Sequence, residues 1–148
     1  MTHVDFYILP DDQLITAQRY VCKLAEHNWQ SGKRVLIQTD SAEESHQLDD
    51  LLWNIQDNSF IPHGVATLEL TDQHQPILIS HQKINDENFQ SVLNLSSRPA
   101  DICIENEIKI DEILNQDEQR KLSGRQHYKV YRELDYTLEH HILENTND

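Results

Sequence analysis

The stretch formed by residues 32–64 most constrains the fold, because it reads as a buried strand followed directly by a capped helix. Residues 35–37, Val-Leu-Ile, form a short unbroken apolar run, which is typical of a strand covered on both faces in a parallel sheet. Ser41 precedes an acidic first turn, and Glu44, three residues later, gives the capping-box spacing of a helix start. The stretch therefore predicts a β-strand at 34–39 and an α-helix that begins near Ser41.

This helix carries an apolar stripe on one face and a tryptophan on the other. At about 100° per residue, Trp53 points away from the stripe and onto the polar face that carries His46. Phe60 follows in a turn that contains Pro62. The two aromatic residues predict an exposed patch, and such patches are commonly binding surfaces, although a neighbouring loop that covers Trp53 is an open alternative. The apolar stripe consists of Leu48, Leu51, Leu52 and Ile55.

The rest of the chain continues the alternation of strands and helices. Gly32 is well placed as the left-handed residue that ends a helix over residues 14–29. A second long helix is expected at 117–134, although Gly124 costs about 1 kcal/mol in its interior. Right-handed crossovers then place helices on both faces of the sheet, so residues 1–148 predict one three-layer, Rossmann-like α/β domain with a mostly parallel sheet. The other expected strands are 4–9, 76–80, 90–95, 108–114 and an edge strand at 136–142, with partial alternation at 65–70 and a disordered end at 145–148.

The composition limits the classes of protein to which the chain can belong. The chain carries 12 basic and 26 acidic residues, a net charge of −14, which argues against direct, phosphate-driven binding of nucleic acid. Cys22 and Cys103 fall in apolar patterns without a disulfide framework, so we interpret them as buried thiols of a reducing compartment. No signal peptide or membrane-spanning run is recognisable. These features predict a cytoplasmic protein with no membrane partner.

The C-terminal helix is basic in an otherwise acidic chain. Five of the 12 basic residues lie between positions 120 and 132, and this window contains no acid. Spacings of three, four and seven residues bring most of them and one tyrosine onto a single face, which suits an acidic peptide. A solvated helix whose cations pair with acids elsewhere is the open alternative. The face consists of Lys121, Arg125, Tyr128, Lys129 and Arg132.

Motifs of catalysis and of metal binding are absent. Residues 31–33, Ser-Gly-Lys, end a helix and precede a strand, which is the reverse of a phosphate loop, and no GxGxxG or GxSxG occurs. His140 and His141 are adjacent and so lie on opposite faces of a strand, while His63 is expected to be a turn residue satisfied locally. We therefore expect no cofactor, no metal and no catalytic residues.

Several strings resemble one protein family. FYIL near the N-terminus is followed by GKRVLI, LDDLLW and SFIPH, and then by QDEQ and RQHYKVYR near the C-terminus. In this order and spacing the strings resemble the chi subunit of bacterial DNA polymerase III, a small accessory protein of the clamp loader. The chain departs from that pattern at residues 98–107, which lack the expected aromatic residues.

The resemblance implies a non-catalytic adaptor in DNA replication that meets nucleic acid only indirectly. Trp53 and Phe60 match the aromatic residues by which the family holds its psi partner. The basic helix matches the docking site for the acidic C-terminal tail of single-stranded DNA-binding protein. Arg125, Tyr128 and Lys129 match the core of that site, and Lys121 and Leu114 match its flanking contacts. Two alternatives stay open, an enzyme on a mononucleotide-binding fold and an adaptor outside replication.

Overall fold

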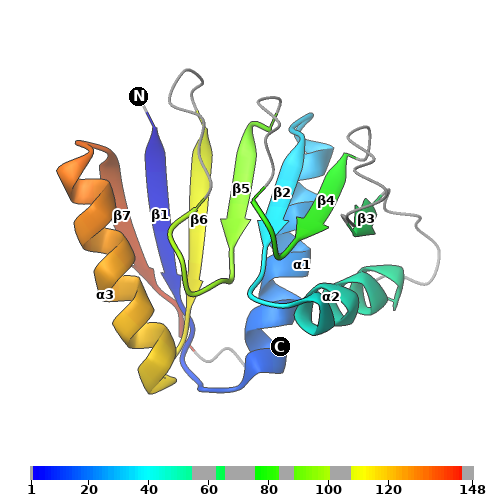
Figure 1. Cartoon of the computed structure of the whole chain (residues 1–148), viewed down its shortest axis with the longest axis horizontal. Coiled ribbons are helices and arrows are strands. Elements are labelled where there is room, and N and C mark those ends of the chain that lie inside the picture. The colour runs from blue at the N-terminus through cyan, green and yellow to red at the C-terminus, as the bar shows by residue number, and fades with distance from the viewer. Residues whose placement is uncertain (1, 55–62, 66–75, 84–88, 101–107, 145–148) are drawn as a thin grey trace.

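The computed structural model describes residues 2–54, 63–65, 76–83, 89–100 and 108–144. The described part contains three helices and one seven-stranded sheet (Figure 1). The helices are α1 (Leu14–Gln30), α2 (Ala42–Asn54) and α3 (Glu118–Glu133). The strands are β1 (His3–Ile8), β2 (Val35–Gln38), β3 (His63–Val65), β4 (Ile77–Ser80), β5 (Ser91–Asn94), β6 (Lys109–Leu114) and β7 (Thr137–Ile142).

The sheet is parallel at every strand pair, so the prediction of a mostly parallel α/β sheet is confirmed. The strand order is β3-β4-β2-β5-β6-β1-β7, and all strands in Figure 1 run in the same direction. β2 lies near the middle and its four residues are all buried, as expected for a strand covered on both faces. β7 is an edge strand, as predicted, and it pairs with β1.

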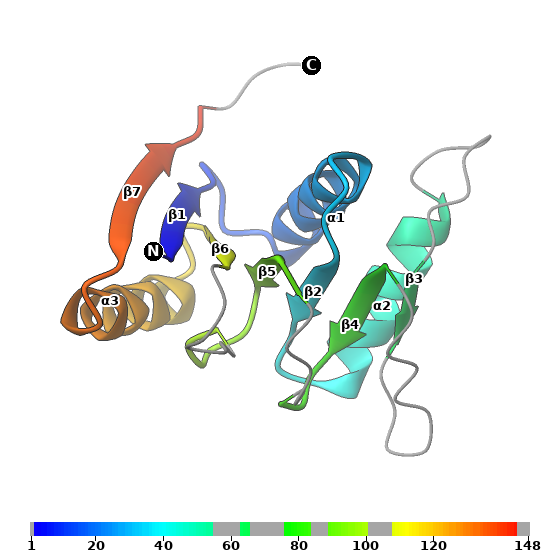
Figure 2. The ribbon, with the colours of Figure 1, turned by 90° about the horizontal axis from the view of Figure 1, so that it is seen from above.

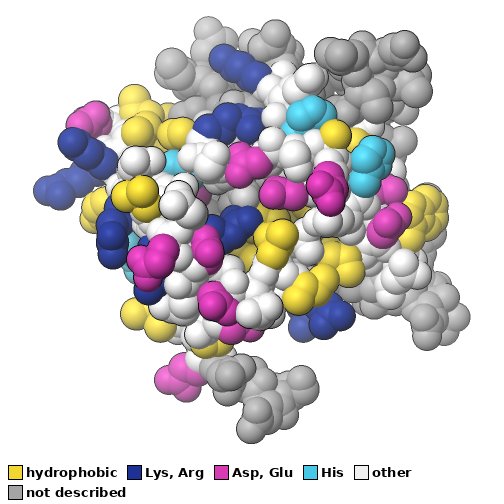
Figure 3. Space-filling model, turned by 60° about the horizontal axis from the view of Figure 1, so that its bottom comes forward, with side chains coloured by type: hydrophobic (Ala, Val, Ile, Leu, Met, Phe, Trp, Pro, Cys, Tyr) yellow, Lys and Arg dark blue, Asp and Glu magenta, His cyan; other side chains and the backbone are white. Residues whose placement is uncertain are grey.

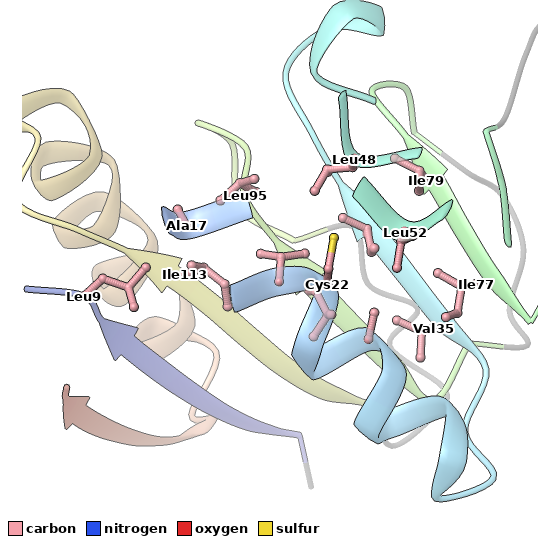
Figure 4. Packing of buried hydrophobic residues seen from close by; sticks show 14 residues of the cluster. Leu9, Ala17, Cys22, Val35, Leu48, Leu52, Ile77, Ile79, Leu95 and Ile113 are labelled. Carbon is pink, nitrogen blue, oxygen red and sulfur yellow. The ribbon is translucent and has the colours of Figure 1, made fainter. Parts of the chain in front are cut away.

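Helices cover both faces of the sheet, which gives the predicted three layers. Figure 2 shows α1 and α3 on opposite sides of the strands. Side chains of α1 and α2 pack together against one face, with Cys22, Leu48 and Ile37 among the buried residues (Figure 4). On the other face, Tyr131 of α3 packs with Phe6. Burial raises the pKa of the Cys22 thiol to about 12, so this residue is the buried thiol that the sequence predicted.

The ends of the helices follow from local chemistry. The Ser41 hydroxyl accepts a hydrogen bond from the Glu44 amide at 3.1 Å, as the capping pattern predicts. Gly32 has a φ of 87° and so adopts the left-handed conformation that ends α1. Asp117 caps α3 by accepting from the Arg120 amide at 3.2 Å. Local sequence therefore decides where these three helices stop and start.

The region after α2 differs from the sequence prediction at His63. His63 was expected in a turn, and that expectation is wrong, because His63 begins β3 and is buried, with Nε2 3.0 Å from Asp49 Oδ1 of α2. Strand structure occurs at 63–65, while residues 66–70 lie outside the described residues. Ile55, Phe60, Cys103 and the end at 145–148 also lie outside them.

β1 lies between two strands from the far end of the chain. His3 is level with Lys109 of β6 and with Thr137 of β7, so both pairings join segments more than 100 residues apart. The Leu9 amide continues the ladder by donating to the Leu114 carbonyl at 2.9 Å. The N-terminal strand is therefore held entirely by the C-terminal third of the described chain.

Candidate functional site

A pocket of about 380 Å³ opens between α3 and the strands beneath it. Ile8 and Leu114 are the last residues of β1 and β6, so the pocket lies at the carboxyl ends of parallel strands. Helix α3 supplies the other wall. The lining residues are Phe6, Ile8, Leu114, Asn115, Gln116, Lys121, Gly124, Arg125, Tyr128 and His140.

Gly124 sets how closely α3 approaches β6 at this pocket. It is buried in the helix interior, and a Cβ atom placed on it would lie 2.5 Å from Cδ1 of Leu114. Only a residue without a side chain fits there while Leu114 keeps its position. The glycine that weakens the helix pattern in the sequence is thus explained by packing.

Three aromatic rings form one side of the pocket. The Phe6 ring stacks on the His140 imidazole, with centroids 5.0 Å apart and planes at 12°. Tyr128 completes the group, at 5.8 Å from Phe6 and 5.2 Å from His140. Because the three rings come from β1, β7 and α3, they form an apolar wall only after the sheet and helix have packed.

Cations surround the pocket. Arg125 and Lys129 are exposed, and among the described residues neither makes an ion pair. Lys121 has one distant partner, Glu118, at 3.9 Å, and that carboxylate is almost fully exposed. Lys and Arg side chains lie along the left side of Figure 3, over α3, while acidic side chains are spread across the rest of this face. The pocket therefore combines an apolar floor with unneutralised positive charge.

A buried polar network fixes α3 over the sheet. His127 Nδ1 lies 2.8 Å from Oε1 of Glu112, and its Nε2 lies 2.9 Å from the Ser97 carbonyl. Tyr131 donates to Oε2 of the same glutamate at 2.5 Å, and Asn94 donates to it at 2.7 Å. Every one of these side chains is buried, so leaving one unpaired would cost about 1–3 kcal/mol.

The surroundings of His127 favour its protonated form. Both ring nitrogens lie near oxygen atoms, which suits a ring that donates from both nitrogens. Burial lowers the pKa of His127, but the hydrogen bond and the negative charge of Glu112 outweigh that effect and raise the pKa above its usual value. In its protonated form His127 makes an ion pair with Glu112 that joins α3 to β6.

The structure brings together most of the predicted helix site. Leu114, Lys121, Arg125 and Tyr128 all line the pocket, whereas Lys129 lies one turn further along α3 and does not. Sequence reasoning missed the residues contributed by β1 and β7. Alternation in the last strand was a signal for His140, but nothing local to the sequence paired it with a helix 12 residues earlier. The missed apolar and aromatic members are Phe6, Ile8 and His140.

Of the two residues of the predicted aromatic patch, Trp53 lies in the part of the chain that the structure describes. Trp53 is 54% exposed, and residues 55–62, which follow it, lie outside the described residues. Its ring meets the His63 imidazole edge to face, with centroids 5.0 Å apart. His63 Nε2 lies 3.0 Å from Oδ1 of Asp49, on the same helix as Trp53. Phe60, the other predicted member of the patch, lies outside the described residues.

Comparison with known protein families shows to which family the chain belongs. The family model described as "DNA polymerase III chi subunit, HolC" matches residues 1–139. The chain belongs to this chi family. The match includes all of α3 and the first half of β7, so every residue that lines the pocket except His140 lies inside the matched region.

Curated relatives agree along nearly the whole length of this chi-family chain. Three proteins named "DNA polymerase III subunit chi" come from Pseudomonas aeruginosa, Haemophilus influenzae and Escherichia coli. They are 27%, 32% and 29% identical to the chain, over 143, 128 and 143 residues respectively. The alignments cover 97%, 86% and 93% of this chain and 98%, 88% and 96% of the relatives. The chain is thus an accessory subunit of the replicative polymerase.

Solved structures of lower similarity show the fold alone. UvsW of phage T4 superimposes with a TM-score of 0.66 at 9% identity, covering 96% of this chain and 41% of UvsW. Dbp5 of S. cerevisiae gives 0.63 at 11% identity, covering 98% of this chain and 42% of dbp5. In the described part of the chi-family chain, no helix combines the length and apolar character needed to span a bilayer.

Proposed function

We propose that the pocket beside α3 binds the acidic C-terminal tail of single-stranded DNA-binding protein. One observation carries the proposal: an apolar pocket is lined by Arg125, which makes no ion pair among the described residues, on a protein of net charge −14. An acidic peptide that ends in hydrophobic residues is complementary to both features.

Each part of such a peptide has a counterpart in the pocket. The guanidinium of Arg125 can pair with the terminal carboxylate through two parallel hydrogen bonds. The last apolar side chain then fits between Leu114 and the ring of Tyr128. The aspartates that precede it meet Lys121 at the rim and Lys129 one turn further along.

The aromatic patch serves a different partner in this proposal. Trp53 lies on α2, and α2 packs on the sheet face opposite α3, so the two surfaces do not overlap. We assign Trp53, together with Phe60, to the psi-like subunit that joins the protein to the clamp loader. The subunit is then a non-catalytic adaptor, and single-stranded DNA is retained only when its binding protein is also present.

A peptide titration at two salt concentrations tests the tail site. Arg125→Ala removes a forked pairing at the anchor and is expected to weaken binding by about 2 kcal/mol or more. Lys129→Ala, the matched control on the same helix face, removes a screened charge and is expected to cost about 1 kcal/mol or less. A peptide without its final apolar residue is expected to bind poorly at either salt concentration, because charge alone does not fill the pocket.

The opposite pattern would contradict the proposal. Equal losses for Arg125→Ala and Lys129→Ala, with the shortened peptide binding as well as the full one, would indicate a diffuse electrostatic surface and no anchor at Arg125. Both variants are expected to fold as the wild type does, since both side chains are exposed and unpaired among the described residues. Melting temperatures within a few degrees of wild type check this point.

A further inference from the structure

Two histidines and two carboxylates converge on the edge of the sheet, on the face opposite α3. In the parallel ladder between β1 and β7, Asp5 is level with Glu139. His3 lies two residues before Asp5, and His141 lies two residues after Glu139, so all four side chains project from the same face. This group is separate from the pocket, to which β7 contributes His140 on its other face.

The potential ligand atoms of three of these residues form one cluster, and His141 lies beside it. His3 Nε2 is 3.0 Å from Asp5 Oδ1, and His141 Nε2 is 2.9 Å from the same oxygen. Glu139 Oε2 is 3.7 Å from His3 Nε2 and 3.8 Å from His141 Nε2. Within the described chain, the ligand atoms of His3, Asp5 and Glu139 all lie within 4.8 Å of one another.

The separations between His3 and the two carboxylates suit a tetrahedral zinc site. With Zn–N and Zn–O bonds of about 2.0–2.2 Å, neighbouring ligand atoms in a tetrahedron lie about 3.3–3.5 Å apart. His3 Nε2 lies 3.0 Å from Asp5 Oδ1 and 3.7 Å from Glu139 Oε2, on either side of that value. His141 Nε2 is close to both carboxylates but lies outside the group of mutually close ligand atoms, so its side chain must turn toward His3 to become the fourth ligand.

Neighbouring side chains hold the ligands in place. Lys109 of β6 lies 2.5 Å from Oδ2 of Asp5, which leaves Oδ1 to face the two imidazoles. The His141 ring stacks on Tyr7, with centroids 5.0 Å apart, and this contact keeps it beside the cluster. Such outer contacts are what orient metal ligands in protein sites.

We propose that His3, Asp5 and Glu139, joined by His141 when its side chain turns toward them, bind a divalent transition-metal ion, with Zn²⁺ as the best match. Two imidazoles and two carboxylates suit zinc, whereas Ca²⁺ and Mg²⁺ are bound by oxygen ligands. The ion can enter from solvent, because the side chains of His3, His141 and Glu139 are 34%, 40% and 56% exposed. It joins the edge strand β7 to β1 through side chains, in addition to the backbone ladder.

Zinc binding to the full chain, freed of metal by a chelator, tests the proposal. Isothermal titration with Zn²⁺ is expected to give one ion per chain and a higher melting temperature, because the ion binds only the folded state. The double substitution of His3→Ala and His141→Ala is expected to lower affinity by about 100-fold or more, since even loss of an outer contact costs about 10–100-fold. Mg²⁺ in excess is expected not to displace the zinc.

Two further variants make the result decisive. Glu139→Gln preserves the shape of an exposed side chain, and it is expected to weaken zinc binding without changing the melting temperature in chelator. His27→Ala removes an exposed histidine of α1 and is the control, with zinc affinity expected to match wild type. Absence of saturable zinc binding, or equal losses in His27→Ala and in the double variant, would overturn the proposal.

Discussion

Substitution of Gly124 by alanine tests how the pocket is built. The new Cβ would lie 2.5 Å from Cδ1 of Leu114, whereas carbon atoms in contact are about 3.5–4.0 Å apart. The leucine methyl must therefore move by roughly 1 Å or more. Leu114 is only partly buried and lines the pocket, so the open direction for this movement is into the pocket itself.

The expected effects on stability and on binding differ in size. Alanine in place of glycine stabilises a helix interior by about 1 kcal/mol. Moving Leu114 from its preferred rotamer costs about 0.5–1.5 kcal/mol, so the free energy of unfolding is expected to change by about 1 kcal/mol or less. Peptide binding is expected to suffer more, because losing the burial of one apolar side chain costs about 1.5–3 kcal/mol, roughly 10-fold or more in affinity.

The assay combines urea unfolding with titration of the acidic tail peptide, on a cycle of four proteins. Leu114→Ala removes both methyl groups that the new Cβ would meet. In that background, adding Gly124→Ala is expected to leave peptide affinity unchanged, so the two substitutions couple strongly. Equal effects of Gly124→Ala in both backgrounds, or full peptide affinity in the single variant, would refute the steric argument.

Two other predictions concern the aromatic patch and the buried ion pair. Trp53→Ala is expected to weaken a complex with the psi-like partner by about 2 kcal/mol or more. It is expected to barely change the melting temperature, because the ring is 54% exposed. A large loss of stability with intact partner binding would place the ring in the core. The raised pKa of His127 means that its pairing with Glu112 stabilises the fold fully below the ordinary histidine pKa of about 6.5 and is lost as pH rises through the higher, folded-state pKa. The stability advantage of wild type over His127→Gln, measured by urea unfolding, is therefore expected to be larger at about pH 6 than at about pH 9, and a constant difference would argue against a charged His127.

Local patterns predicted the elements that local chemistry controls. The apolar run at 35–37, the Ser41 cap and the left-handed Gly32 each depend on a few adjacent residues, and each appears in the structure as expected. His63 differs because β3 forms by pairing with β4, where His63 is level with Ile77, a residue 14 positions later in the chain. Polar residues paired in this way resemble turn residues in the sequence.

The site was predictable to the extent that one helix carries it. Lys121, Arg125 and Tyr128 share a face of α3, and helical spacing alone places them together. Phe6 and His140 join them through strand pairing between the two ends of the chain, which no spacing rule reports. The same limit applies to the cluster of His3 and His141, where the sequence showed only isolated histidines.

The position of β1 between β6 and β7 has a consequence for how the protein is made. At about 5–20 residues per second, a ribosome needs on the order of 10 s to pass from residue 8 to residue 142. During that interval the apolar side chains of Val4 and Phe6, both fully buried in the finished domain, have neither neighbouring strand nor helix. The first strand of the nascent chain is therefore unpaired and exposes its apolar side chains. Incomplete chains that stop before residue 109 are expected to depend on chaperones to stay out of aggregates.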